Sequence, residues 1–128
     1  MNDYPQPRNL GDRQLTIASP IVLVGERNMN LGPRIDFAKV TLRFEPSEQF
    51  EVVDLVGIDD GARKFEFPEQ FISGLLVVLT ANEGGPLTRL RITLMEAVYD
   101  AIDSSPRAFF EAGRNAGRRL LDMEIGDG

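Results

Sequence analysis

A strand that passes directly into a capped helix limits the possible folds of this chain more than any other feature. Apolar and polar residues alternate along 89–98, which is typical of a half-buried strand. A polar Asp-Ser-Ser-Pro stretch at 103–106 then precedes a segment in which aromatic and small residues have helical spacing. Ser105 suits the N-cap position of a helix and Pro106 suits its first position. The sequence therefore predicts a strand over 89–98 and a helix over 105–122.

Upstream segments predict the rest of the secondary structure. β-branched and alternating residues indicate strands over 16–24, 37–45 and 50–57, with the third strand antiparallel to the second. Glycines, asparagines and a proline indicate a long loop over 25–36. A proline near the start and a Gly-Gly pair after the end bound a predicted helix over 68–83.

The predicted element order, β-β-β-α-β-α, indicates an α+β fold in which the sheet and the helices form a two-layer α/β sandwich. A single domain is expected over 16–122, because a chain of 128 residues suits one domain. Residues 1–15 lack apolar periodicity and are expected to form a flexible N-terminal arm. Residues 123–128 are expected to form a frayed C-terminal tail.

The composition excludes several kinds of chemistry. The chain has no cysteine and no histidine, which rules out disulfides, thiolate nucleophiles, imidazole catalysis and zinc sites built on these residues. We therefore expect no catalytic site, no metal and no cofactor. The net charge of −6 has the wrong sign for a protein held to nucleic acid mainly by phosphate contacts.

No membrane or export signal is evident in the sequence. The longest apolar run, 72–81, is about half the ~20 residues that a membrane-spanning helix needs. The amino-terminal residues do not have the basic and then apolar pattern of a signal sequence. A cytoplasmic location is therefore expected.

Several segments resemble domain IV of bacterial elongation factor G. RITLMEAVYDAIDSSPRAFFEAGRNAGRRLL, residues 91–121, is similar to that domain's closing strand, tyrosine-containing turn, DSS motif and alanine-rich helix. FAKVTLRFEP, residues 37–46, resembles its second strand, and FEVVDLVG, residues 50–57, resembles the next. FPEQFISGLLVVLTANEGGPL, residues 67–87, is similar to its proline-started helix and glycine loop. The resemblance covers about 16–122.

This resemblance implies a ribosomal-protein-like sheet with helices on one face and an unusual left-handed strand-helix-strand crossover. It also implies a ribosome-facing tip made of two loops, 25–36 and 96–103. The candidate residues of the tip loops are Arg27, Asn28, Asn30, Arg34, Tyr99 and Asp100. Asp100 stands where the family has a histidine, and no GxxxxGK[ST] motif for GTP is present. The chain is therefore expected to be a stand-alone domain that is not itself a GTPase.

Three groups of residues have a structural and a functional interpretation. Asp103, Ser104 and Ser105 suit a helix cap better than a catalytic serine, since no histidine supplies a base. Arg107, Arg114 and Arg118 are either a solvated helix face or a contact for an anion or RNA. The remaining group is the acidic turn and basic segment at 54–64. The acidic turn could bind calcium but lacks the regularly spaced oxygen ligands of a calcium loop, and the basic segment could bind nucleic acid.

Function is less constrained than fold. The first hypothesis is a noncatalytic module for protein interaction or self-association, for which a large apolar sheet face would be evidence. The second is an RNA- or ribosome-binding module related to translation elongation, which a contiguous basic tip would favour. The third is an enzyme of unknown class, because a fold does not determine function. The tip loops carry more acidic than basic residues, so the tip is expected to be net negative.

Overall fold

The computed structural model describes residues 4–5, 14–32, 34–56, 66–100 and 102–126. Within these residues, four strands and two helices follow the order β-β-β-α-β-α, as predicted. In chain order these elements are β1 (Ile21–Leu31), β2 (Arg34–Pro46), β3 (Glu51–Asp54), α2 (Phe67–Thr80), β4 (Leu90–Val98) and α3 (Pro106–Gly126).

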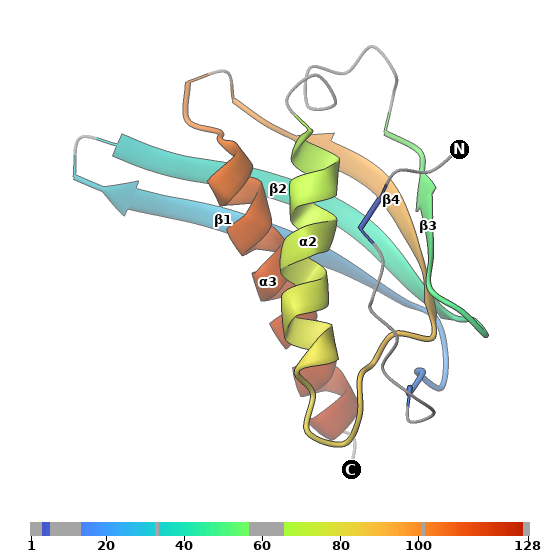
Figure 1. The fold of residues 1–128 in the computed structure, drawn as a ribbon. Helices are drawn as coiled ribbons and strands as arrows, with labels where there is room; N and C mark the ends of the chain where they lie inside the picture. The colour runs from blue at the N-terminus through green and yellow to red at the C-terminus, as the bar shows by residue number, and fades with distance from the viewer. Residues whose placement is uncertain (1–3, 6–13, 33, 57–65, 101, 127–128) are drawn as a thin grey trace.

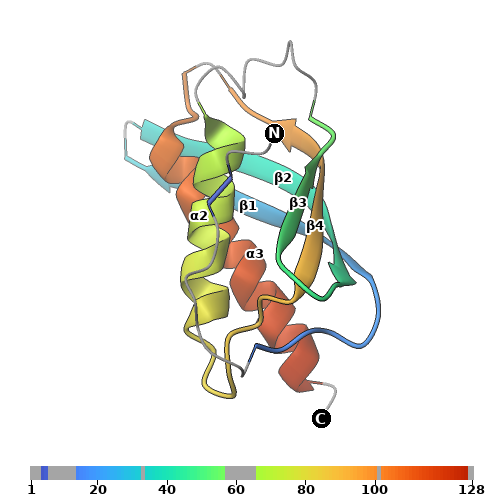
Figure 2. The same ribbon diagram turned by 45° about the vertical axis from the view of Figure 1, so that its right-hand side comes forward.

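The four strands form one sheet, and both helices cover the same face of it (Figure 1; Figure 2). The strand order is β1-β2-β4-β3, in which β2 pairs antiparallel with β1 and β4, and β3 pairs parallel with β4. In Figure 1, β3 and β4 both point upward, α2 lies in front of the sheet, and β4 lies to the left of β3. The β3-α2-β4 crossover is therefore left-handed, and the predicted two-layer α+β fold is confirmed.

The third strand has a different neighbour from the one expected. We predicted that it would pair with the second strand, but β4 lies between β2 and β3. β3 therefore runs in the opposite direction to β2 but does not pair with it. The crossover through α2 returns the chain to the inner side of β3, so the last strand enters the middle of the sheet.

The predicted loop at 25–36 is mostly a β-hairpin. β1 begins at Ile21 rather than at residue 16, and its pairing with β2 continues to Leu31 opposite Arg34. Gly32 has a positive φ of 73°, which suits a glycine in the connecting turn. Glycine and asparagine disfavour strands by their local preferences, but pairing with β2 satisfies the backbone of this segment and outweighs them.

The described part of the predicted N-terminal arm packs on the domain. Tyr4 is buried, and its hydroxyl donates to the Asp54 carboxylate. Leu15 forms a parallel bridge with Leu87, and its amide donates to the Pro86 carbonyl at 2.7 Å. These contacts are with residues far along the chain, which local periodicity does not reveal. Residues 1–3 and 6–13 lie outside the described residues.

The helix ends also differ from the predicted ones. α2 ends at Thr80, three residues earlier than expected, while α3 continues to Gly126, beyond the expected end at 122. The segment 123–126 is thus helical rather than frayed. Of the acidic turn and basic segment at 54–64, residues 57–64 lie outside the described residues.

The core fills the space between the sheet and the helices. Its largest fully buried side chains come from both layers, namely Phe44, Leu42 and Ile92 from the sheet and Phe71, Leu75 and Phe109 from the helices. The helices touch backbone to backbone where Gly74 of α2 meets Gly113 of α3. A Cβ added to Gly74 would lie 1.9 Å from the Phe110 carbonyl oxygen, and one added to Gly113 would lie 1.9 Å from that of Phe71. No side chain fits there unless the helices separate.

We predict that Gly113→Ala lowers the free energy of unfolding by about 1–3 kcal/mol, because this overpacking exceeds the ~1 kcal/mol that alanine gains in helix propensity. Urea denaturation measures the change. Gly84→Ala is the control, since its added Cβ would lie 3.9 Å from the nearest atom. We expect that control to change stability by less than about 0.5 kcal/mol. Equal stability of the Gly113→Ala variant and the wild type would contradict the backbone contact.

Candidate functional site

The connection from β4 to α3 is hydrogen-bonded to β2 at Phe37, directly after the predicted loop at 25–36. The Phe37 amide of β2 donates to the Asp103 carbonyl at 2.9 Å, and the Ser104 hydroxyl donates to the Phe37 carbonyl at 2.7 Å. We call these two segments the tip, which comprises the described residues of 28–36 and of 99–105. Both segments lie at the same end of the molecule in Figure 1.

Asp100 organises the connection between β4 and α3. Its Oδ1 accepts from the amides of Ile102 at 2.8 Å and Asp103 at 3.0 Å. Its own amide donates to Ser104 Oγ at 2.8 Å, and its carbonyl accepts from the Ser104 amide at 3.0 Å. The two amides that bind the carboxylate, Ile102 first, lower the pKa of Asp100 below its ordinary value. The charged form of Asp100 therefore holds the loop in this conformation.

Ser105 begins α3 in the way that the sequence indicates. Its hydroxyl accepts from the Ala108 amide at 3.0 Å, which is the N-cap interaction, and Pro106 is the first helical residue. Ser104 lies one residue earlier and uses its hydroxyl to join the loop to β2. Asp103 contributes its backbone carbonyl to the bond with Phe37.

Arg27 and Asp36 form an ion pair on the helix-facing side of the hairpin. Arg27 Nη2 lies 3.5 Å from Asp36 Oδ2, and the two side chains are 19% and 7% exposed. The net charge of this pair is zero, so two of the residues expected to give the tip its charge neutralise each other. The side chain of Arg34 lies outside the described residues.

Tyr99 belongs to the core more than to the tip surface. It is half-buried, and its ring makes an edge-on contact with Phe67 at a centroid distance of 5.9 Å. Phe67 also stacks on Phe109 at 4.4 Å. This aromatic cluster joins the ends of β4, α2 and α3 beneath the tip.

The tip exposes large apolar side chains that the sequence analysis did not single out. Ile102 is 90% exposed, Ile35 45% and Met29 43%, and the polar Asn28 and Asn30 are exposed beside them. In the sequence, these residues differ from their neighbours only in being apolar within polar segments. Isolated exposed apolar residues are common, so this pattern does not indicate a site. Met29 and Ile35 lie on opposite faces of the hairpin, because Met29 pairs with Asp36 and Ile35 pairs with Asn30.

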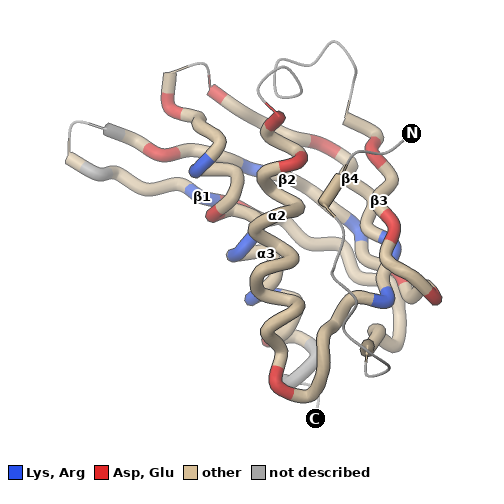
Figure 3. The backbone as a smooth tube through the Cα atoms, in the orientation of Figure 1, with Lys and Arg blue, Asp and Glu red and all other residues tan. Residues whose placement is uncertain are grey.

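The arginines of α3 do not form a compact site. Arg107 and Arg118 are exposed, but they lie 11 positions apart, about 16 Å along a helix. Arg114 pairs with Glu111 at 3.3 Å. Arg119 donates to the Val24 carbonyl at 2.7 Å on the outer edge of β1. Figure 3 shows basic residues distributed along α3 and none on α2.

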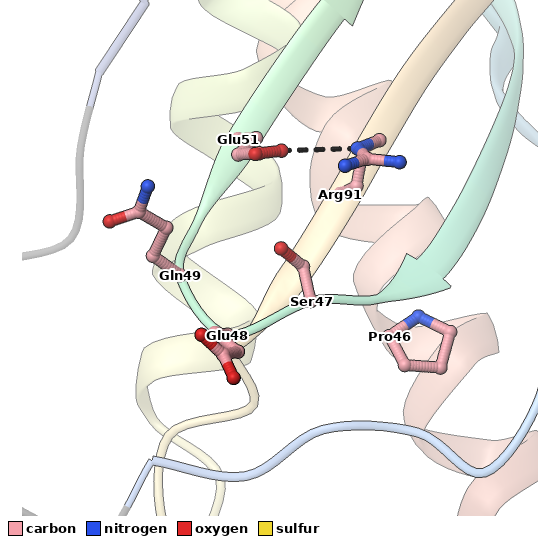
Figure 4. Close-up of a pocket in the computed structure, with 6 residues that line it drawn as sticks. All are labelled: Pro46, Ser47, Glu48, Gln49, Glu51 and Arg91. Carbon is pink, nitrogen blue, oxygen red and sulfur yellow. Dashed lines mark hydrogen bonds and ion pairs between the residues drawn. The ribbon is translucent and has the colours of Figure 1, made fainter.

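The face of the sheet opposite the helices contains ion pairs and also exposed apolar side chains, including Val22, Val53 and Val98. Arg91 binds Glu51 at 3.0 Å across β4 and β3, and Arg43 lies 3.8 Å from Glu45. The hydrogen bond from Arg91 to Glu51 raises the pKa of Arg91. An open polar hollow of about 590 Å³ lies at the β2–β3 turn beside this pair and is lined by Pro46, Ser47, Glu48, Gln49, Glu51 and Arg91 (Figure 4).

The described part of the chain contains no group of three acidic side chains placed to hold a metal ion. None of its helices is both long enough and apolar enough to cross a membrane.

Comparison with known proteins identifies the class of domain. The sequence model of elongation factor G, domain IV, matches residues 16–123. The chain is 33% identical over 92 residues to elongation factor G 1 of Syntrophomonas wolfei subsp. wolfei, an alignment that covers 70% of this chain and 13% of that protein. A crystal structure of a Thermus thermophilus protein shares the fold, with a TM-score of 0.72 and 20% identity over 83% of this chain and 16% of that one.

These matches define the chain as an α+β domain of a translation-related class. The chain belongs to the elongation factor G domain IV family. It spans 13% of the length of the curated relative.

We predict that protection of the Ile102 and Asp103 amides from hydrogen exchange depends on an ionised Asp100. Because the folded-state pKa of Asp100 is lowered, this protection should be complete above the ordinary value of 3.8 and lost as the pH falls through the folded-state pKa. NMR exchange measurements on the wild type and Asp100→Asn test this, because asparagine keeps the acceptor oxygen and does not titrate. The same acid-dependent loss in both proteins would contradict the role of the carboxylate.

Proposed function

We propose that the chain is a noncatalytic binding module that docks onto a protein surface of the ribosome with its tip. One observation carries the proposal: the carboxylates of Asp36 and Asp100 are bound within the domain, whereas a large apolar side chain before α3 faces solvent. Asp36 pairs with Arg27, and Asp100 binds loop amides, while Ile102 is 90% exposed. An exposed bulky apolar side chain beside carboxylates favours a protein partner over a phosphate backbone.

The hydroxyl groups at the tip support a binding role over catalysis. Ser104 Oγ accepts from the Asp100 amide and donates to the Phe37 carbonyl, and Ser105 Oγ caps α3. A serine nucleophile needs a free hydroxyl beside a base. Both hydroxyls instead hold the backbone, and the sequence contains no histidine to serve as the base.

The outer face of the sheet gives little support to self-association. A stable dimer face would be expected to have an apolar centre. Here the strands present charged residues that pair with one another, including Arg91 with Glu51. Apolar residues such as Val22 and Met95 are exposed among polar neighbours. The tip is therefore the better candidate for the interaction surface.

RNA binding through α3 is a second candidate function. The exposed side chains of Arg107 and Arg118, together with membership of a translation-related family, favour it. Arginine suits phosphate contacts because its planar guanidinium can donate two parallel hydrogen bonds. The distance between the two arginines, the pairing of Arg114 with Glu111 and the net charge of −6 count against it.

We predict that the purified protein cosediments with bacterial ribosomes but not with ribosomal RNA stripped of protein. Affinity should change less than about tenfold between about 50 and 200 mM salt, whereas several phosphate contacts would cost about a thousandfold or more. Arg107→Ala with Arg118→Ala is the control and should bind like the wild type. Binding to stripped RNA that disappears with salt and in this double variant would support the RNA-binding alternative, and absence of ribosome binding would contradict the proposal.

A further inference from the structure

The connection between β4 and α3 presents one bulky apolar side chain to solvent. Ile102 is 90% exposed, more than any other large apolar residue in the described part of the chain; Leu55 follows at 63%. A side chain of this size is stabilised when it moves from water to an apolar site. In the folded domain Ile102 is not in contact with such an apolar site, so a binding partner can provide one.

The backbone beneath Ile102 is fixed by hydrogen bonds. The Ile102 amide donates to Asp100 Oδ1 at 2.8 Å, and the Asp103 amide donates to the same oxygen. Ser104 completes the network, because it binds Asp100 through its amide and hydroxyl and Phe37 of β2 through its hydroxyl. A loop that is already ordered loses little entropy when it binds, which favours its use as a contact.

The charges around Ile102 indicate what kind of surface it fits. Asp100 is exposed, and Asp103 is half-exposed. Acidic groups beside the side chain repel the phosphates of RNA, whereas lysine or arginine residues at the edge of a protein pocket would complement them.

We infer that Ile102 is the anchor of the docking surface and inserts into an apolar pocket with a basic rim on a ribosomal protein. Asp100 is its positioning residue, since its carboxylate orients the Ile102 backbone. This inference rests on the proposed function, which names the tip and the ribosome but not the contacting side chain. A single bulky side chain in a pocket can dominate the affinity of such an interface.

Matched substitutions and cosedimentation with purified bacterial ribosomes test the anchor. Ile102→Ser should weaken binding by about tenfold or more, as expected for a dominant interface side chain. Val77→Ser, which changes a 50% exposed apolar residue on α2, should leave binding unchanged. Asp100→Ala should also weaken binding, and Asp100→Asn should weaken it less, because asparagine keeps the oxygen acceptor.

Photocrosslinking from position 102 identifies the molecule contacted. A benzophenone amino acid at 102 should form adducts with a ribosomal protein at a peptide that contains lysine or arginine, and the same group at 77 should form none. Nuclease-sensitive adducts with ribosomal RNA would overturn the inference. If the wild type binds ribosomes and Ile102→Ser binds equally well, the anchor is wrong and the proposed function stands. If the wild type does not bind ribosomes, both are wrong.

Discussion

Backbone contact between α2 and α3 determines how the rest of the domain is arranged. Gly74 and Gly113 let the helices touch without intervening side chains, which keeps both helices in one layer. Gly25 does the same between α3 and β1, where an added Cβ would lie 2.8 Å from the Ala112 carbonyl oxygen. α3 thereby lies against both α2 and the edge strand β1, and the connection before it is hydrogen-bonded to Phe37 of β2. The position of the tip follows from these close approaches.

The tip combines a rigid backbone with few available charges. Ser104 and Asp103 join the loop to Phe37 of a central strand, so the loop takes its position from the sheet. Asp100 occupies the place where the family resemblance puts a histidine, and its carboxylate binds the loop's own amides. The family relationship accounts for the fold and the translation-related class. The chemistry of these residues supports a protein contact in place of a contact with phosphates.

Local patterns predicted the elements that are stabilised locally. The alternation along β2 and β4 and the capping sequence before α3 are visible in the sequence because each depends on neighbouring residues. The parallel pairing of β3 with β4 and the burial of Tyr4 depend on distant partners, so local patterns did not predict them. The end of the β1–β2 hairpin was missed because glycine and asparagine disfavour strands locally. For the tip, the sequence predicted that the two segments meet. It could not show that Arg27 and Asp36 neutralise each other or that Ile102 faces solvent.

Hydrogen–deuterium exchange of the domain with and without bacterial ribosomes tests the central claim most directly, because it maps the contact surface without altering a residue. Docking through the tip predicts that ribosomes slow exchange at the end of the β1–β2 hairpin and in the connection before α3, and leave the outer face of the sheet and the middle of α3 unchanged. Slower exchange along α3 around Arg114 and Arg118, with no change at the tip, would contradict the account.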